Sequence, residues 1–375
     1  MKWVAEQRSL DAVLEELSRQ SIIAVDTEAD SLHSYFDKVC LIQTSTPAED
    51  AVIDPLAKID LTRFGEILAD PSIVKVLHGA DYDLRILNRD FGFTISNLMD
   101  TMICSQLLGY EGIGLAALLK KHFNADIDKS SQRADWAMRP LPPKMLDYAT
   151  RDTHYLIALS RKLRQELEAL GRWGWAEEEF KRLETIRFKE PDPDAEGFRK
   201  IKGSSKLDRR NLAVLSSLHR WRDSVARKLD RPPFKVLGNE ILVSIATTIP
   251  RDAGELSAIK GVSPYVMSKN GNDLLQHIEH AMALSEDELP SRGEVRPWMR
   301  DKDLERKIEK LKKVRDRIAT DLRIDPSVLA PKHVLSAIAA DSPKSVEDLA
   351  HVTAMREWQK SVVAPALLEA LNREP

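Results

Sequence analysis

The spacing of apolar positions changes once along the chain. In roughly the first 80 residues, short apolar runs rich in β-branched side chains alternate with helical stretches, which is typical of strands buried between helices. Beyond Asp81 the apolar positions follow a helical spacing almost to the C-terminus. The pattern predicts an α/β domain followed by helices, with strands at residues 22–25, 39–44, 51–53 and 73–77.

Breaks in this pattern divide the chain into domains. Residues 190–197 alternate proline with aspartate and end in glycine, which is typical of a linker. A weaker break containing glycine and proline lies at 291–297. We therefore expect one α/β domain, one linker and two helical domains, at 1–190, 191–205, 206–286 and 300–373 respectively.

The two helical domains repeat one pattern. A gapless shift of 93 residues superimposes their apolar positions and the prolines that separate their helices. Leu218 then falls on Leu311, and Arg222 falls on Arg315. Two helical hairpins could share such a pattern by chance, but the unbroken register favours a duplication.

The composition is that of an ordinary globular protein. Its 375 residues are too many for one core, and 43% of them are hydrophobic. No apolar run reaches the roughly 18 residues that would span a membrane, and no secretory signal is visible at the N-terminus. Cys40 and Cys104 both lie in apolar contexts, which is typical of reduced, buried thiols. We expect a cytoplasmic protein without a disulfide or a zinc site.

Charge is distributed unevenly along the chain. The net charge is −3, yet residues 198–282 carry 15 basic against 8 acidic side chains, and residues 1–197 carry 24 against 34. A basic middle segment suggests a polyanionic partner. An acidic first domain would repel that partner unless some of its carboxylates hold cations.

Two carboxylates stand at the end of the first predicted strand. Asp26 and Glu28 are two residues apart, so their side chains point to one face of a strand, about 7 Å apart along the backbone. Paired carboxylates leaving a buried strand are costly unless a cation neutralises them. Carboxylate oxygens are the ligands that Mg²⁺ and Mn²⁺ prefer. The pair therefore predicts a divalent metal site.

Two further segments supply candidates for the same site. Asp81 and Asp83 follow the strand at 73–77; a helix N-cap would explain Asp81, and the helix dipole would explain Asp83. Tyr148 and Asp152 are four residues apart in a predicted helix and share one face, where they could orient water beside a metal or form a plain surface pair. Position alone does not separate these interpretations.

Together, these segments resemble the DEDD superfamily of 3′→5′ exonucleases, in the subgroup whose third motif is Tyr-x-x-x-Asp. Asp26-Thr27-Glu28 looks like the first motif of this subgroup. The segment 78–83 looks like the second, with Asp83 at the acidic position, and the segment 148–152 looks like the third. The stretch 129–141 is similar to the one before the third motif in ribonuclease D and its nuclear exosome relatives. The helical repeats resemble HRDC domains. The resemblance implies an α/β ribonuclease H-like exonuclease domain, a mixed sheet flanked by helices, followed by two all-α HRDC helical bundles.

The resemblance also implies a mechanism. Four carboxylates would hold two Mg²⁺ or Mn²⁺ ions: Asp26 would bridge both, Glu28 and Asp152 would bind the first, and Asp83 would hold the second largely through water. Tyr148 would orient the attacking water. RNA would be hydrolysed from a free 3′ end to nucleoside 5′-monophosphates.

Six further residues are candidates for substrate contacts, each with a structural alternative. His78, Gln132, Trp136 and Arg139 lie near the motifs, although a strand-end histidine and a core tryptophan are common without any ligand. Arg220 and Arg222 belong to the basic segment, where solvated helix faces are the alternative.

Two other functions remain open at this point. The same motifs occur in DNA exonucleases, although the HRDC repeats and the 129–141 segment favour RNA. A non-catalytic RNA-binding protein would need a missing motif residue, and all five are present. By resemblance we expect a monomer acting on RNA with a free 3′ end, with tRNA precursors as the leading substrates.

Overall fold

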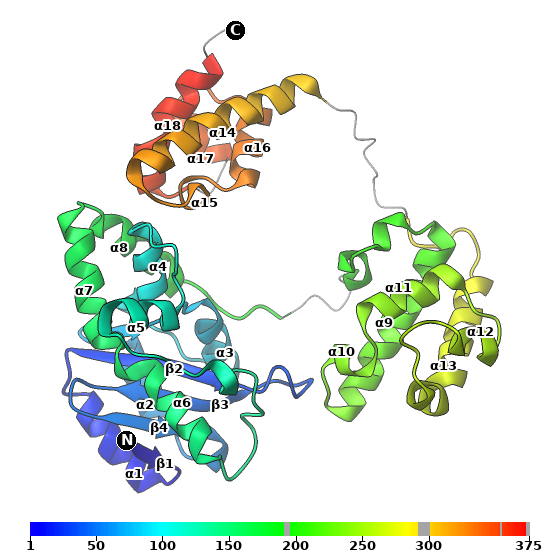
Figure 1. Ribbon diagram of the computed structural model, residues 1–375, viewed down its shortest axis with the longest axis horizontal. Coiled ribbons are helices and arrows are strands. Elements are labelled where there is room, and N and C mark those ends of the chain that lie inside the picture. The colour runs from blue at the N-terminus through cyan, green and yellow to red at the C-terminus, as the bar shows by residue number, and fades with distance from the viewer. Residues whose placement is uncertain (191–195, 292–300, 353–354, 373–375) are drawn as a thin grey trace. The chain divides into compact units, whose positions relative to one another are not determined.

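The computed structural model describes residues 1–190, 196–291, 301–352 and 355–372. The chain divides into two compact units, one of Met1–Ala29, Lys38–Phe188 and Arg300–Pro375, the other of Asp30–Asp37 and Lys189–Met299 (Figure 1). Two breaks were expected, at 190–197 and 291–297. Residues 191–195 of the first and 292–297 of the second lie outside the described residues. The domain boundaries expected from the sequence therefore stay predictions.

A six-stranded mixed sheet forms the centre of the first unit. Its strand order is β1-β4-β3-β2-β5-β6. β3 runs antiparallel to both of its neighbours, and the other pairs are parallel. The strands are β1 (Lys2–Val4), β2 (Ile22–Ala29), β3 (Val39–Ser45), β4 (Asp50–Ile53), β5 (Val74–Leu77) and β6 (Leu98–Asp100).

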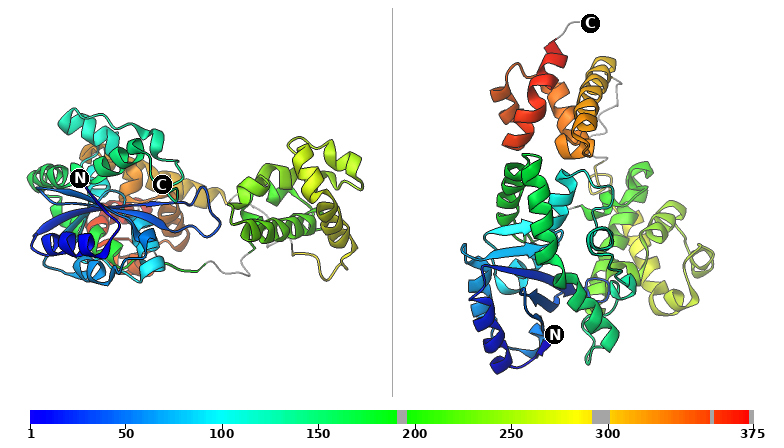
Figure 2. Two further views of the ribbon diagram at one scale, coloured as in Figure 1. Left: turned by 90° about the horizontal axis from the view of Figure 1, so that it is seen from below. Right: turned by 60° about the vertical axis from the view of Figure 1, so that its left-hand side comes forward.

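Helices cover both faces of this sheet (Figure 2). They are α1 (Gln7–Leu17), α2 (Thr62–Ala69), α3 (Asp81–Phe91), α4 (Thr101–Leu107), α5 (Leu115–Phe123), α6 (Pro143–His154), α7 (Leu156–Ala169) and α8 (Trp173–Glu184). α6 packs on β2, β3 and β4, while α7 packs on β2 and β5. The central strands are therefore shielded from water, which explains their continuous apolar runs.

Some sequence predictions differ from the structure. The pattern missed β1 and β6, because each has three residues, too few to show a period. Asp81 is not an N-cap: α3 begins at Asp81 with Ala80 as the cap residue, and the Asp81 carboxylate pairs with Arg85 one turn on, at 2.8 Å. β2 extends beyond 22–25 to Ala29, so both predicted carboxylates lie within the strand.

The second unit contains the first helical module. Its elements are η3 (Gly197–Lys200), η4 (Ser204–Lys206), α9 (Arg209–Leu229), α10 (Pro233–Val236), α11 (Asn239–Thr248), α12 (Ala253–Ser257) and α13 (Pro264–Ala283). Leu218, Leu242 and Leu274 are fully buried in a core of its own. Phe198 and Ile201, which fall in the expected linker, pack into this same core.

The second helical module repeats the first with the predicted register. It consists of α14 (Lys302–Leu322), α15 (Pro326–Leu329), α16 (Lys332–Asp341), α17 (Val346–Val352) and α18 (Glu357–Asn372). The first three helices begin and end 93 residues after α9, α10 and α11. Arg222 donates to the carbonyl oxygen of Leu237 at 2.9 Å, and Arg315 donates to that of Ala330 at 2.8 Å. The repeated hydrogen bond and helix bounds support the duplication.

Within the first unit, the second module packs on α8. The Trp175 and Trp358 rings stack at 4.7 Å, and the Trp358 indole donates to the buried Glu179 carboxylate at 3.0 Å. Arg172 donates to the carbonyl oxygens of both Leu107 and Leu322. Some apolar side chains of this module pack into the core of the α/β domain.

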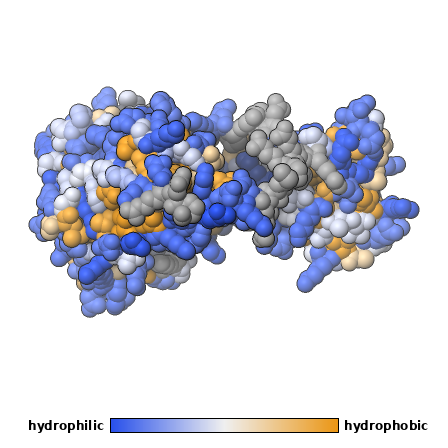
Figure 3. All heavy atoms as spheres, turned by 90° about the horizontal axis from the view of Figure 1, so that it is seen from above, coloured by the Kyte–Doolittle hydropathy of each residue, from blue (hydrophilic) through white to orange (hydrophobic). Residues whose placement is uncertain are grey.

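Two findings bear on the expectations from composition. Cys40 and Cys104 are free thiols and fully buried. Across the ranges that the structure describes, no helix combines the length and apolarity needed to cross a membrane. On the face drawn in Figure 3, hydrophilic side chains predominate and apolar ones form smaller groups.

Candidate active site

Three carboxylates from two elements meet in one cavity. Asp26 and Glu28 lie on one face of β2, and Asp152 reaches them from α6, which crosses that face. One oxygen from each carboxylate lies within 4.8 Å of the others. The period of two in the strand and the packing of α6 on the sheet together produce this cluster.

Asp83 is held beside the cluster by Thr27. Asp83 occupies the first turn of α3 and is 6% exposed. Its carboxylate accepts a hydrogen bond from the Thr27 hydroxyl, and Thr27 lies between Asp26 and Glu28 on β2. The segment of the first motif thus orients the acidic residue of the second.

The turn before α3 is fixed by Asp100. Its buried carboxylate accepts backbone N–H groups of Gly79 at 3.0 Å and Ala80 at 2.8 Å, and also caps α4 through Met102. Gly79 has φ of +75°, a conformation that side chains rarely adopt. Asp100 therefore sets the position from which α3 and Asp83 begin.

The cavity that contains the cluster has a volume of about 320 Å³. Of the candidate substrate residues, His78 and Gln132 line it. The sequence analysis missed its apolar wall and its glycine: Gly114, Leu115, Ala116 and Ile127. The apolar run that opens α5 was visible in the sequence, but it is indistinguishable there from a core face.

Burial and like charge raise the pKa values of the clustered carboxyls. Burial, followed by the charges of its neighbours, raises the pKa of Asp26 well above its usual range and that of Glu28 to about 9. Burial raises the pKa of both Asp83 and Asp152 to about 7. Protons or a cation must therefore neutralise this cluster near neutral pH.

Tyr148 lies on the same face of α6 as Asp152 and is hydrogen-bonded to it. Burial and the Asp152 charge raise the pKa of the phenol further above its ordinary value. Its ring lies 5.9 Å from that of Trp136. The phenol is therefore protonated, which suits orientation of a water molecule and does not suit a general base.

The remaining substrate candidates have structural partners. Trp136 is 1% exposed and packs under α6. Arg139 forms a two-point ion pair with Asp54, each contact 2.7 Å long, and is not among the residues that line the cavity. Trp136 therefore supports Tyr148 from behind, and Arg139 is engaged within the fold.

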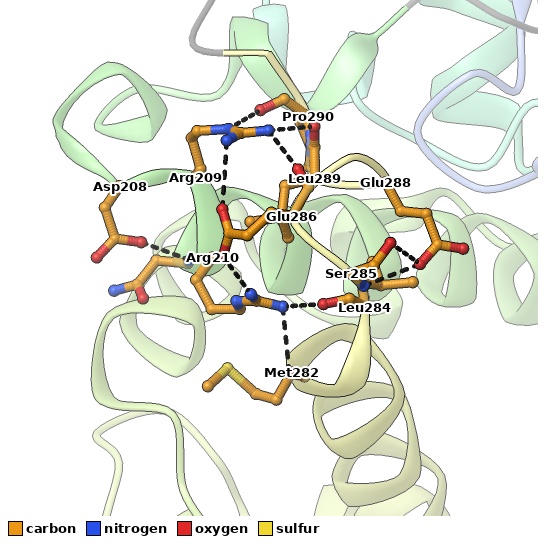
Figure 4. Close-up of polar contacts among 11 residues, drawn as sticks. Asp208, Arg209, Arg210, Met282, Leu284, Ser285, Glu286, Glu288, Leu289 and Pro290 are labelled. Carbon is orange, nitrogen blue, oxygen red and sulfur yellow. Dashed lines mark hydrogen bonds and ion pairs between the residues drawn. The ribbon is translucent and has the colours of Figure 1, made fainter.

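In the first helical module, Arg220 is exposed but Arg222 is not. Arg222 is 6% exposed and is held by Leu237 and Asn239, so it has little access to a phosphate. The neighbouring Arg209 and Arg210 bind Glu286 and nearby carbonyl groups, closing the end of the module (Figure 4). These three arginines of the basic segment therefore stabilise the fold.

The donor set fits hard divalent cations. It consists of carboxylate oxygens, which Mg²⁺ and Mn²⁺ prefer, and among the described residues the cluster includes no thiol or imidazole ligand. Its raised pKa values show that negative charge there is not compensated by the protein. A cation would supply that compensation.

Comparisons with known proteins agree with this geometry. Residues 1–168 match the family described as 3′-5′ exonuclease, and residues 211–278 and 305–371 each match the HRDC domain. The chain is 36% identical to the exosome complex component 10 homolog of Caenorhabditis elegans over 279 residues, which cover 73% of this chain and 32% of that protein. It therefore spans about a third of that relative's length.

Two ribonuclease D proteins match over more of their length. The chain is 33% identical to ribonuclease D of Gluconacetobacter diazotrophicus, covering 76% of this chain and 73% of that one. The crystal structure of Escherichia coli RNase D, an exoribonuclease involved in structured RNA processing, matches with a TM-score of 0.75 and 28% identity, over 100% of this chain and 99% of that one. The expected fold class is confirmed, and the chain belongs to the ribonuclease D family of 3′→5′ exoribonucleases.

Proposed function

We propose that this chain hydrolyses RNA from a free 3′ end to nucleoside 5′-monophosphates, with two Mg²⁺ or Mn²⁺ ions held by its carboxylates. The observation that carries the proposal is the convergence of Asp26, Glu28 and Asp152 within 4.8 Å, with Asp83 held beside them through Thr27. When bound, such ions lower the pKa of the attacking water and stabilise the leaving 3′ oxygen.

The side chains around the cluster have distinct roles in this proposal. Asp26 would serve both cations, Glu28 and Asp152 would hold one of them, and Asp83 would hold the other. The Tyr148 hydroxyl orients the attacking water, because its protonated phenol donates one hydrogen bond and accepts another. His78 and Gln132 contact the 3′-terminal nucleotide, whose base lies against Leu115 and Ile127.

We propose tRNA precursors with extra 3′ nucleotides, and other small structured RNAs, as the substrates of a cytoplasmic, monomeric enzyme. The similar E. coli RNase D is an exoribonuclease involved in structured RNA processing, which supports this choice. Arg220, exposed on the basic module, is the better candidate for a phosphate contact than the buried Arg222.

The test is a Mg²⁺-dependent degradation assay on tRNA with a short 3′ extension, with matched RNA and DNA oligomers in parallel. Asp83→Asn and Tyr148→Phe should each lower the single-turnover rate at least tenfold while the protein stays folded. Full activity in either variant removes that residue from its role. Equal rates on the RNA and DNA oligomers contradict the RNA preference.

A further inference from the structure

Gln43 is a fully buried amide without a hydrogen-bond partner, and it lies next to the proposed metal site. Its side chain is 0% exposed, and neither its Nε2 nor its Oε1 atom has a partner. Almost all buried polar groups in proteins are hydrogen-bonded, because desolvating them without compensation costs free energy. An orphaned amide in the central sheet therefore calls for a partner among the polar groups that face it.

The strand register places this amide beside Asp26. Gln43 on β3 is directly opposite Asp26 on β2, so the two side chains point to the same face of the sheet. The Cβ atoms of such a pair are about 4.5–5.5 Å apart, within reach of an amide-to-carboxylate hydrogen bond. α6, which carries Asp152, covers this face.

The other neighbours of Gln43 on this face cannot complete its hydrogen bonding. Across the sheet on the other side lies Val52, and along β3 lies Leu41, both apolar and fully buried. The remaining neighbour, Ser45, already bonds Asp50 and Thr153, each at 2.7 Å. Among its neighbours within the sheet, Asp26 is therefore the acceptor that remains.

Three of the four carboxyls receive different donors. The Thr27 backbone N–H donates to Asp26, the Thr27 hydroxyl donates to Asp83, and Tyr148 is hydrogen-bonded to Asp152. Asp26, the residue proposed to face both cation positions, thus has one backbone donor to fix a group with two oxygens. A second donor would define how both oxygens are directed.

We propose that Gln43 is a positioning residue for Asp26: with the cations bound, its side-chain amide donates an N–H group to the Asp26 carboxylate and fixes the direction of its oxygens. Residues that hold metal ligands in this way contribute to affinity without touching the metal. This inference rests on the proposed function, because it requires Asp26 to be a metal ligand.

The experiment measures two properties that should move in opposite directions. Mn²⁺ alone is titrated into the full-length protein by calorimetry and by electron paramagnetic resonance, and thermal unfolding of the metal-free protein is recorded. Gln43→Leu should weaken Mn²⁺ binding about 10- to 100-fold. It should leave the unfolding temperature of the metal-free protein unchanged or higher, because it removes an uncompensated buried amide.

Thr44→Val is the matched control. Thr44 is the next residue of β3, is 1% exposed, and also has an unpartnered side-chain oxygen, but it points to the opposite face. This variant should keep Mn²⁺ affinity within twofold of wild type. Gln43→Met, which preserves side-chain length, provides a second variant if Gln43→Leu does not fold.

The outcomes separate this inference from the proposed function. If Asp26→Asn abolishes Mn²⁺ binding but both Gln43 variants bind as wild type does, Gln43 has no positioning role. An equal loss of affinity in Thr44→Val overturns the proposal as well, since the effect would then be general to β3. If wild type binds no Mn²⁺, or Asp26→Asn binds it normally, the proposed function itself fails.

Discussion

Buried carboxylates lack a cationic partner in one region of the first unit and have one in another. In the cavity at the end of β2, Asp26, Glu28 and Asp152 face one another without any lysine or arginine among the residues that line it. Where α8 meets the second helical module, the buried Glu179 is paired with Arg356 at 2.9 Å and with the Trp358 indole at 3.0 Å. In the first arrangement the protein leaves the negative charge of the carboxylates uncompensated. In the second, an arginine neutralises the charge of the carboxylate.

The difference separates function from stability. Like charges held together raise each other's pKa and oppose folding, so their persistence indicates a ligand that compensates them. A buried carboxylate with its own donors requires no ligand and locks two helices together. Removing a charge should therefore have opposite effects on stability in the two regions.

The largest effect is expected from Asp26→Asn. The rate of RNA hydrolysis should fall about 1,000-fold or more, equivalent to about 4 kcal/mol of transition-state stabilisation. The metal-free protein should at the same time become more stable near neutral pH, because an amide needs neither a proton nor a cation to neutralise it. Single-turnover kinetics and thermal unfolding of the metal-free protein measure both. A variant that loses activity by unfolding would contradict the comparison.

In the second region, Glu179→Ala should destabilise the first unit by about 3 kcal/mol. It leaves the Trp358 indole without an acceptor and Arg356 without its carboxylate. Hydrolysis of a short RNA oligomer by the folded protein should change little. The control is Glu177→Ala, an exposed residue of the same helix, which should change stability by less than about 0.5 kcal/mol. Urea unfolding measures both, and equal effects would show that the pairing is unimportant.

A similar comparison applies to the buried arginines of the two helical modules. Arg315→Met and Arg222→Met each remove the donor to an equivalent carbonyl group, that of Ala330 or Leu237, and should each cost about 2 kcal/mol. Because the second module packs part of its apolar surface into the core of the α/β domain, Arg315→Met should loosen the first unit, whereas Arg222→Met should loosen only the second. Hydrogen exchange of α14 and α9 distinguishes them. Identical exchange patterns would refute the asymmetry.

Stability and metal binding should also depend on pH through the clustered carboxyls. The folded-state pKa values of Asp83 and Asp152, about 7, and of Glu28, about 9, are raised above those of an unfolded chain. Their stabilising contribution is complete below about pH 4 and is lost as the pH rises through 7 and then 9. Between pH 6 and 8, the metal-free protein should lose stability. Over the same range the Mn²⁺ affinity should rise, by about tenfold per pH unit for each proton that the ion displaces. Asp152→Asn should flatten both trends, and unchanged trends would contradict the assignment.

The sequence predicted most of the architecture that depends on local periodicity. The four longest strands, the helix that carries Tyr148 and Asp152, and the 93-residue repeat were visible because each extends over enough residues to show a pattern. β1 and β6, with three residues each, were not visible. Their strand conformation comes from pairing with β4 and β5, which are remote in the sequence.

The candidate site was predicted in part. Asp26, Glu28, Tyr148 and Asp152 lie together in the cavity, as their motifs suggested. Arg139 and Arg222 look like phosphate ligands in the sequence, yet each is used inside the fold, by Asp54 in one case and by Leu237 and Asn239 in the other. A basic side chain gives the same signal in either role, and the partner that decides between them is distant along the chain.

By itself, the sequence determined which residues form strands and helices, which faces are apolar, and that the helical module is duplicated, because these properties follow from the spacing of side chains along one segment. Only the tertiary structure decided that Asp83 is held by Thr27, that Gln43 lies opposite Asp26, and that the second module packs on α8. These contacts join remote segments, and their free energy depends on which groups are buried together.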